Sequence, residues 1–340
     1  MPPTGDSTMR AITHHRYGGP EVLAVETVDR PKPAHDRVLI RVQAAEACKS
    51  DCEMRGFDFS VKWFWLPLRL ALGVRRPRRS ILGLYFAGVV EEVGADVAGF
   101  TPGDAVYGSP GMRRGAYGEY LSLPADAVIA AKPMSMSFAE AAAVPLGAIN
   151  ALHFLRATDL TQGERILING AGGVIGAYAV QLAAAWGAQV TAVDAGHKEA
   201  FVRELGASSF VDYQRTSVTE LDERFDVIFD MVASTRVGPM LRLLGPGGRY
   251  AHGNPRVRTL LRAPFVSRFT DKRMHVAFAD ETPAVLTELA ALADAGVIGP
   301  IVDRVLPMEE APEAHRLVET EERVGAVVLA IGPRAEASVG

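Results

Sequence analysis

The sequence predicts an α/β fold of two domains, one built from antiparallel strands and one from a doubly wound parallel sheet. The chain has 340 residues, more than a single hydrophobic core usually holds. Short apolar-alternating runs separated by Gly and Pro fill residues 10–123, whereas apolar strands alternate with helical patterns after Pro133. The last segment leaves this alternation, so we expect it to return to the first domain.

The first domain is expected to be antiparallel and partly barrel-like. Its clearest strand patterns are residues 38–42, 87–93 and 105–107, the last of which follows a Thr-Pro-Gly-Asp turn at 101–104. In the second domain, a strand at 165–169, a helix at 174–186 and a strand at 189–193 make one βαβ unit. Further strands are expected at 209–211, 225–229 and 249–251, then a helix at 283–295 and a strand at 326–331.

Composition and charge exclude several classes of protein. With 48% hydrophobic and 22% charged residues, the chain can bury a core and is not a disordered tail. A net charge of -4 supplies no positive field for a phosphate backbone, so no nucleic-acid partner is expected. Cys48 and Cys52 are too few for a four-thiolate zinc site or a disulfide framework, and they suit a reducing cytoplasm.

No membrane partner is expected either. Residues 1–8 lack the apolar core of a signal peptide and read as a loose extension. The most hydrophobic run, 61–72, is too short to span a bilayer and is interrupted by Lys62, Pro67 and Arg69.

A glycine-rich loop indicates nucleotide binding. It lies between the strand at 165–169 and the helix that follows, where glycines let a pyrophosphate approach the helix N-terminus. Its members are Gly170, Gly172, Gly173, Val174, Ile175 and Gly176. An acidic residue, Asp194, ends the next strand, which completes the dinucleotide pattern.

Asp194 bears on the choice of cofactor. A carboxylate at this place hydrogen-bonds the adenosine ribose and repels a 2′-phosphate, which favours NAD. His197 and Lys198 lie nearby, and Asp194 could instead only cap the next helix, so NAD and NADP both stay open.

Further motifs give the chain a family resemblance. It is similar, from about Met9 to Ile331, to the medium-chain dehydrogenase/reductase superfamily and its zinc-independent quinone oxidoreductase-like branch. The segments that carry the resemblance are residues 10–12, 17–20, 88–94, 102–108, 115–120, 141–145, 179–182 and 205–207. The resemblance implies a GroES-like β domain (9–131 and 273–340), an inserted Rossmann domain (132–272), NADP as the usual cofactor and a homodimer.

The zinc motifs of this superfamily are incomplete here. Cys48-Lys-Ser-Asp51 matches the first motif, but Gly83-Leu84-Tyr85 stands where zinc members have Gly-His-Glu. His35 and His153 lie in no matching motif, and a lone thiolate cannot hold zinc, so no metal is expected. Without a Lewis acid the substrate must already be activated, as an enone, enoyl compound or quinone is, and alcohol oxidation is the poorer prediction.

Three residues are candidates for proton delivery. Tyr85 could donate a hydrogen bond or a proton to a developing enolate, or could simply pack at a strand end. Asp51 and Ser50 match residues that lie by the nicotinamide in relatives, and Ser50 occupies the hydroxyl position used for proton relay in zinc members. Either could instead cap the following helical turn.

The resemblance also implies cofactor contacts for Asn150 at the nicotinamide end and for Tyr213 at the adenosine end. Ala326 replaces a frequent lysine, for which Arg323 might substitute as a basic contact; a solvated charge is the alternative. Residues 57–80 carry Trp63, Phe64, Trp65 and an arginine cluster, and with residues 255–272 they could form a lid over a large apolar substrate. Amphipathic packing against their own domain is the other interpretation.

The sequence therefore favours a zinc-independent oxidoreductase that uses NAD(P)H to reduce an activated C=C bond or a quinone. Two alternatives stay open. One is a redox-neutral biosynthetic enzyme, such as a cyclase or isomerase, on the same fold; the other is a non-catalytic NAD(P)H-binding sensor.

Overall fold

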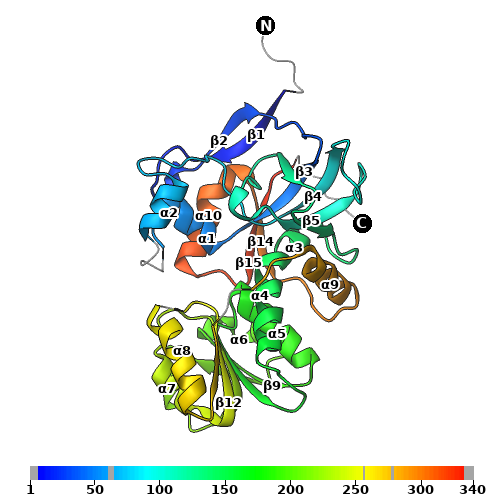
Figure 1. The fold of residues 1–340 in the computed structure, drawn as a ribbon. Coiled ribbons are helices and arrows are strands. Elements are labelled where there is room, and N and C mark those ends of the chain that lie inside the picture. Colours follow the sequence, from blue (N-terminus) through cyan, green and yellow to red (C-terminus); the bar gives the residue numbers. More distant parts are fainter. Residues whose placement is uncertain (1–6, 60–64, 256, 277–278, 333–340) are drawn as a thin grey trace. The chain divides into compact units, whose positions relative to one another are not determined.

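The computed structural model describes residues 7–59, 65–255, 257–276 and 279–332, which form two compact units (Figure 1). The first unit comprises Met1–Pro145, Glu281–Asp294 and Val302–Gly340, and the second comprises Leu146–Asp280 and Ala295–Ile301. The divisions at 145/146 and 280/281 fall a few residues beyond those expected from the sequence. The final segment returns to the first unit, apart from the short stretch 295–301.

The first unit contains a seven-stranded sheet and a two-stranded ribbon. The ribbon pairs β1 (Thr8–Thr13) with β2 (Ala24–Asp29), both antiparallel. The sheet runs in the order β14-β15-β3-β4-β5-β7, and β6 pairs with β3 off this path. Its strands are β3 (Arg37–Ala47), β4 (Phe86–Val93), β5 (Ala105–Ser109), β6 (Tyr120–Pro124), β7 (Val128–Ala131), β14 (Val302–Pro307) and β15 (Ala326–Ala330).

Strand β3 organises this sheet because it pairs with β4, β6 and β15. Val38, Ile40 and Val42 alternate along it and all enter the core, as a strand period of two requires. Gly88 on β4 faces it so closely that a Cβ there would lie 2.4 Å from the carbonyl oxygen of Arg41. The antiparallel β domain predicted from these patterns is confirmed, with one parallel pair, β14–β15, added.

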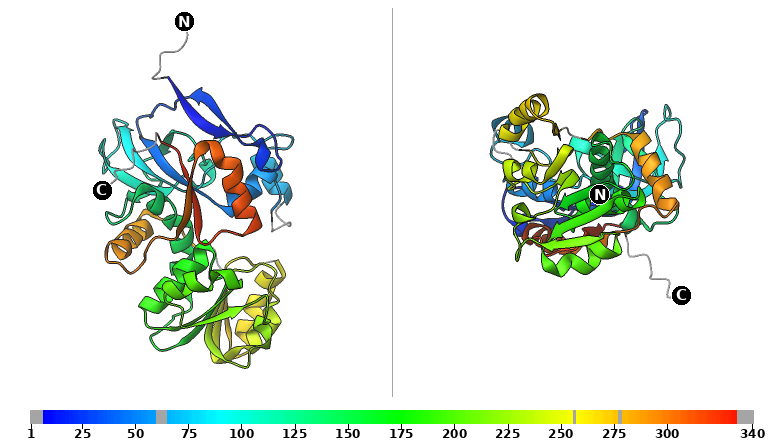
Figure 2. Two further views of the ribbon diagram at one scale, coloured as in Figure 1. Left: turned by 180° about the vertical axis from the view of Figure 1, so that it is seen from behind. Right: turned by 90° about the horizontal axis from the view of Figure 1, so that it is seen from below.

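Helices cover the first unit's sheet. Ser137 and Glu140 form a capping box that begins α3, and Figure 2 shows α10 from behind, beside β14 and β15. The helices are α1 (Lys49–Gly56), α2 (Trp65–Leu72), α3 (Phe138–Ala142), α9 (Pro283–Asp294) and α10 (Ala311–Thr320), with short 3-10 turns η1 (Pro20–Val22), η3 (Gly111–Arg113) and η6 (Met308–Glu310). Helix α4 (Val144–Ala157) begins at the boundary and runs into the second unit.

The second unit is a doubly wound sheet of parallel strands with helices on both sides (Figure 2). The order β10-β9-β8-β11-β12-β13 reads 3-2-1-4-5-6, which is the Rossmann order. The strands are β8 (Arg165–Asn169), β9 (Gln189–Asp194), β10 (Ser209–Asp212), β11 (Phe225–Asp230), β12 (Leu244–His252) and β13 (Arg273–His275). The helices are α5 (Val174–Ala185), α6 (Glu199–Glu204), α7 (Val237–Arg242) and α8 (Val257–Phe269), with η4 (Gly196–Lys198) and η5 (Val218–Glu220).

The predicted α/β class is confirmed, and one strand boundary is corrected. Strand β12 begins at Leu244 rather than after the glycines at 245–248, because Leu244 already pairs with Phe225 of β11. The ladder then shifts register before Val227, so the glycine turn becomes an irregularity inside the strand.

Candidate active site and cofactor loop

The loop between β8 and α5 can be built only from glycine at two positions. Gly170 has a φ of +86°, which other residues rarely adopt. At Gly176 a Cβ would lie 2.1 Å from the carbonyl oxygen of Gly170. The amides of Gly170 and Ala171 both donate to the carbonyl of Val193, at 2.9 and 3.1 Å, and so tie the loop to the end of β9.

This loop fits a pyrophosphate. Helix α5 starts at Val174 with Gly173 as its N-cap, and no side chain caps it, so the amides of its first turn, which includes Ile175, are open to a ligand. A Cβ at Gly173 would meet only the Gly170 carbonyl, at 3.5 Å, so the approach on that side is clear of protein atoms. The group it would hold is the pyrophosphate of a nicotinamide dinucleotide.

Asp194 is tied into the loop and its charge is compensated. Its Oδ2 accepts the Gly172 amide at 2.7 Å, and its Oδ1 accepts the Ala195 amide at 2.8 Å. The ammonium of Lys198 lies 3.4 Å from Oδ1, and both side chains are buried. The carboxylate therefore holds the strand end and the loop together as well as facing the expected ribose position.

The other predicted cofactor residues differ in how free they are. Tyr213 follows β10, its amide donates to the carbonyl of Asp194 at 3.2 Å, and its ring is exposed. Asn150 spends an amide hydrogen on the Leu146 carbonyl, one turn earlier in α4, at 2.8 Å. Arg323 lies in the first unit and donates to the carbonyl of Gly325, while its Nε has no partner.

Asp51 is fully buried in α1 of the first unit. Its Oδ2 accepts the thiol of Cys48 at 3.1 Å, and its Oδ1 accepts the amide of Gly83 at 2.9 Å. Gly83 has a φ of +97°, and a Cβ there would lie 2.6 Å from the ring of Tyr117, so only glycine brings this amide to Asp51.

Asp51 and Ser50 lie inside α1, whose N-cap is Cys48 without a side-chain hydrogen bond, so the capping alternative is not what the structure has. Ser50 is half-buried. Burial raises the pKa of Asp51 to about 6, although the hydrogen bonds from Cys48 and Gly83 and the charge of Arg114 act against this rise. Asp51 thus changes protonation close to neutral pH.

Tyr85 comes just before β4 and is not merely packed at the strand end. Its hydroxyl donates to Oε1 of Glu281 at 3.0 Å. Burial, and next the negative charge of Glu281, raise the pKa of Tyr85 well above its ordinary value. The phenol stays protonated, and in the structure its proton points at Glu281.

Two acidic neighbours were not predicted from the sequence. Glu281 is 196 positions from Tyr85, and an acid just before the helical pattern at 283 gave no reason to place it there. Glu46 on β3 is completely buried and neither of its carboxylate oxygens has a hydrogen-bond partner. Burial, and less strongly the charge of Asp51, raise the pKa of Glu46, while Arg323 lowers it. Its place in an apolar strand run was the only signal.

The residues at this site do not fit a zinc ion. Leu84 stands where a histidine ligand would be needed, and the thiol of Cys48 is already bonded to Asp51. Within the described ranges of the chain, no group of three or more His, Cys, Asp or Glu side chains is placed to hold a metal. No helix there is long and apolar enough to cross a bilayer.

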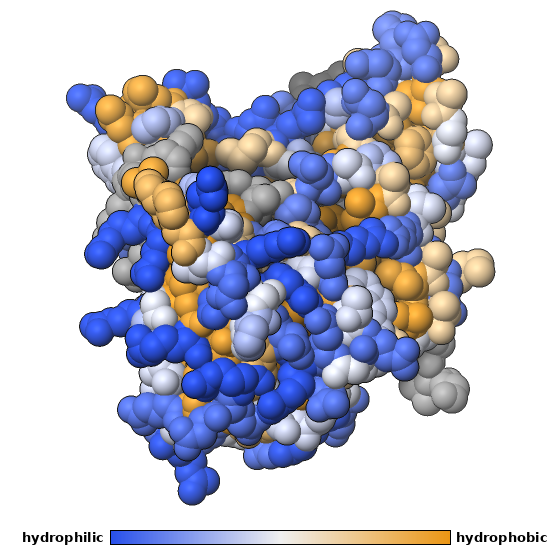
Figure 3. Space-filling view, turned by 60° about the horizontal axis from the view of Figure 1, so that its bottom comes forward, coloured by the Kyte–Doolittle hydropathy of each residue, from blue (hydrophilic) through white to orange (hydrophobic). Residues whose placement is uncertain are grey.

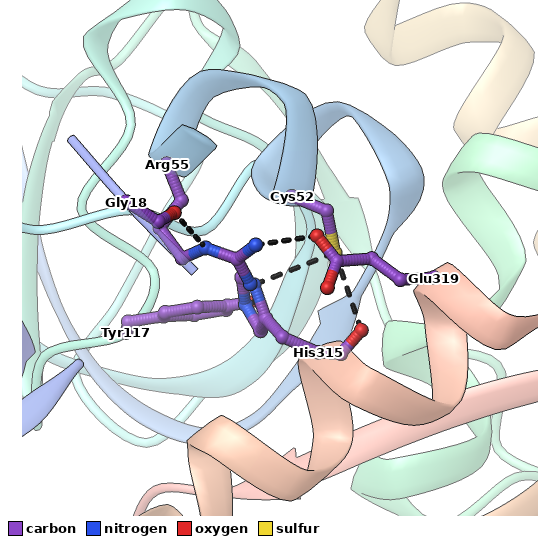
Figure 4. A network of polar contacts seen from close by, with 6 residues as sticks. All are labelled: Gly18, Cys52, Arg55, Tyr117, His315 and Glu319. Atoms are coloured by element: carbon purple, nitrogen blue, oxygen red, sulfur yellow. Dashed lines mark hydrogen bonds and ion pairs between the residues drawn. The ribbon is translucent and has the colours of Figure 1, made fainter. Parts of the chain in front are cut away.

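A buried polar network fixes α1 against α10 (Figure 4). The guanidinium of Arg55 donates to the Gly18 carbonyl at 3.1 Å and to Nδ1 of His315 at 3.1 Å, and pairs with Glu319. Because Nδ1 accepts from Arg55, the His315 proton lies on Nε2, 3.0 Å from the hydroxyl of Tyr117. Burial lowers the pKa of His315 to about 3, so the ring is neutral.

This network was not predicted from the sequence. Its position matters for the site because α1 also carries Asp51. Cys52 joins it through a contact of 3.4 Å to Nδ1 of His315.

The expected lid segments are described in part. Trp63 and Phe64 lie outside the described residues. In α2, Trp65, Leu66 and Leu70 are exposed, while Arg69 lies over the rings of Phe57 and Tyr17, at 4.1 and 4.6 Å. Residues 257–269 form α8, whose Leu261, Phe265 and Phe269 are exposed. Hydrophobic patches of this kind interrupt the mostly hydrophilic face in Figure 3.

The Rossmann sheet and its glycine loop define a dinucleotide-dependent dehydrogenase or reductase. Two family models match the chain: "Alcohol dehydrogenase GroES-like domain" over residues 34–133 and "Zinc-binding dehydrogenase" over 205–329. Quinone oxidoreductase of Sus scrofa is 30% identical over 96% of this chain and 99% of its own length. The chain belongs to the medium-chain dehydrogenase/reductase superfamily, in its quinone oxidoreductase-like branch, and is an NAD(P)H-dependent oxidoreductase.

Other relatives carry different names. The NADPH-dependent alkenal/one oxidoreductase of Arabidopsis thaliana is 29% identical over 94% of this chain and 79% of its own length. The spectinabilin polyketide synthase system protein NorB of Streptomyces orinoci is 34% identical over 78% of this chain, which spans only 12% of that protein. Among solved structures, the quinone oxidoreductase from Coxiella burnetii (27% identity, TM-score 0.84) covers 96% of this chain and 100% of its own. The CurF ER cyclopropanase from the curacin A biosynthetic pathway (25% identity, TM-score 0.83) covers 96% and 100%.

Proposed function

We propose that the protein reduces an activated C=C bond, in an enone or enoyl compound, or a quinone, with NAD(P)H and without zinc. The observation that carries this is the buried Asp51, whose pKa is raised to about 6, beside a sequence that replaces the histidine ligand by Leu84. Such a site offers a proton near neutral pH and lacks the donors of a zinc centre. The named quinone and alkenal reductases among its relatives support the same substrate class.

The cofactor supplies the hydride when it is bound; the chain's residues manage the proton and the negative charge on the substrate oxygen. Asp51 is fully buried, so its proton must pass through a neighbour, and the half-buried hydroxyl of Ser50, next to it on α1, is the group we propose. The Tyr85 hydroxyl is the proposed hydrogen-bond donor to the oxygen, once it turns from Glu281.

We propose that the enzyme prefers NADH. Asp194 is held at the strand end by two backbone amides and neutralised by Lys198, so a 2′-phosphate would compete with a carboxylate for one ammonium. A ribose diol needs no additional cation there. The remaining proposed contacts are Tyr213 at the adenosine end, and Asn150 and Arg323 further along the cofactor.

The first test follows nicotinamide absorbance with NADH and NADPH separately, against quinones and α,β-unsaturated ketones, aldehydes and thioesters. Oxidation with an acceptor from this panel is expected. Tight cofactor binding without oxidation across the whole panel would refute the reductase proposal.

Tyr85→Phe tests the role of the phenol. We expect kcat to fall about tenfold or more while the Kd for the cofactor stays the same, because the lost hydrogen bond acts on the developing charge. An unchanged kcat would reduce Tyr85 to a packing role.

A second candidate is a redox-neutral step in polyketide assembly, such as a cyclisation or isomerisation. Two relatives with such names motivate it, the polyketide synthase protein NorB and the CurF ER cyclopropanase. Product formation from an enoyl thioester with no net change in nicotinamide absorbance would favour it over reduction. A non-catalytic NAD(P)H sensor would bind the cofactor and yield no product at all.

We also propose a cytoplasmic location, because both cysteines are free thiols, and a homodimer. The short edge strand β13 offers an unpaired edge for such a dimer. Sedimentation equilibrium of the purified chain would decide the oligomeric state.

A further inference from the structure

The outward face of helix α8 carries an apolar stripe. Ala263 and Val266 on its inner face enter the core of the second unit. On the outer face Leu261, Phe265 and Phe269 are 66%, 64% and 75% exposed. Their spacing of four residues aligns them along one side of the helix, and the two phenyl rings stack with centroids 6.2 Å apart. An ordered apolar stripe left in water indicates a surface that contacts something else.

The same face is purely basic. Arg258, Arg262 and Arg268 are exposed, and α8 contains no Asp or Glu. At 100° per residue, Arg262 and Arg268 lie on opposite sides of the stripe and Arg258 lies within it. Among the described residues, none of the three is paired with a carboxylate. Three cations thus surround three apolar side chains in a protein whose net charge is -4.

A cavity beside α8 extends this positive surface towards α7. It has a volume of about 430 Å³ and is lined by Arg224, Leu241, Arg242, Val266, Thr270, Asp271 and Lys272. Asp271 is engaged locally, because it accepts the Gly247 amide and pairs with Lys272. On α7 the small Gly238 leaves room for Arg262, whose guanidinium nitrogens lie 3.6 Å from the place of a Cβ there.

We propose that this α7–α8 face binds the surface of an anionic lipid bilayer, with Leu261, Phe265 and Phe269 at the boundary between headgroups and acyl chains. Aromatic and leucine side chains flanked by arginines are the composition of helices that lie in that interface. Guanidinium groups match phosphate oxygens in geometry and charge. A second copy of the chain fits less well, because a symmetric contact would bring the arginines of both copies together. The contact is peripheral and needs no spanning helix.

Co-sedimentation with vesicles tests the proposal on the full chain. We expect binding to vesicles of 70% phosphatidylcholine and 30% phosphatidylserine, weakening as salt is added, and none to phosphatidylcholine alone. Arg258→Gln/Arg262→Gln/Arg268→Gln should lower the partition coefficient about a hundredfold, since each arginine contributes about fivefold. Phe265→Ser/Phe269→Ser should lower it at least tenfold. The control Arg203→Gln/Arg304→Gln/Arg316→Gln removes the same charge from other exposed sites and should bind as the wild type does.

Two results would overturn the proposal. The first is that the wild type does not bind the anionic vesicles, or binds them equally well after the arginine or phenylalanine changes. The second comes from sedimentation equilibrium without lipid. If Phe265→Ser/Phe269→Ser changes the oligomeric state, the face is an interface between copies of this chain instead. Nicotinamide oxidation in solution measures the reductase activity separately, so a failure of one proposal leaves the other intact.

Discussion

Replacing Asp51 by Asn should make the first unit relatively more stable as the pH rises. The folded-state pKa of Asp51 is about 6, above its ordinary value of 3.8. A raised pKa means that the folded state holds the proton more tightly than the unfolded state does. The stabilisation is therefore complete below pH 3.8 and is lost as the pH rises through 6. The shift of about 2.2 pKa units corresponds to about 3 kcal/mol, of which about 2.4 kcal/mol falls between pH 4 and pH 8.

The asparagine variant lacks this loss, and its amide can still accept from Gly83 and contact the Cys48 sulfur. The difference in unfolding free energy between variant and wild type should thus rise by about 2 kcal/mol from pH 4 to pH 8. Urea unfolding in a Trp186→Phe background isolates the signal, because the remaining tryptophans, Trp63 and Trp65, belong to the first unit. Asp126→Asn changes an exposed carboxylate and serves as the control. A difference for Asp51→Asn that stays level with pH, or follows the control, would refute the reasoning.

Three further changes test other parts of the structure. Arg55→Met should destabilise the first unit by about 3–5 kcal/mol, since it leaves buried partners unpaired, whereas Glu319→Gln, at a side chain 39% exposed, should cost about 1 kcal/mol; equal urea midpoints for both would contradict this. Gly173→Val should abolish NADH binding in a fluorescence titration while the fold survives, because its Cβ has space in the protein but would block the pyrophosphate, and Gly245→Ala is the control; retained affinity would remove the loop assignment. Asp194→Ala should raise the ratio of kcat/KM for NADPH over NADH about tenfold or more, since Lys198 is then free for a 2′-phosphate; an unchanged ratio would end the ribose role.

The second unit was the easier part to predict from the sequence, for a local reason. Strand, glycine loop, helix and Asp194 follow one another within about 25 residues, and each depends on neighbours in the chain. The loop's need for glycine at 170 and 176 follows from a positive φ and from a close approach within that same stretch. The strand boundary at Leu244 could not be predicted, because it depends on pairing with Phe225 across the sheet.

The candidate site of the first unit was predicted only as a set of positions. Asp51 and Tyr85 were found through local motifs, but their chemistry depends on groups far away in the sequence. Tyr85 bonds to Glu281, and Arg55 bonds to His315, 260 positions later. Burial, which sets the pKa of Asp51, is likewise a property of the folded sheet and not of the motif.

The buried acids of the first unit indicate what this site exchanges. In a metal centre the ligands must be deprotonated, and a nearby dication favours that form. In this site burial acts in the opposite direction and raises the pKa values of Glu46, Asp51, Cys48 and Tyr85 alike. Four groups that favour their neutral, protonated forms can supply protons or hydrogen bonds to a substrate that gains negative charge. With Leu84 removing the imidazole a metal would need, the donor set of this chain is suited to protonating an enolate or a hydroquinone oxygen rather than to stabilising an alkoxide.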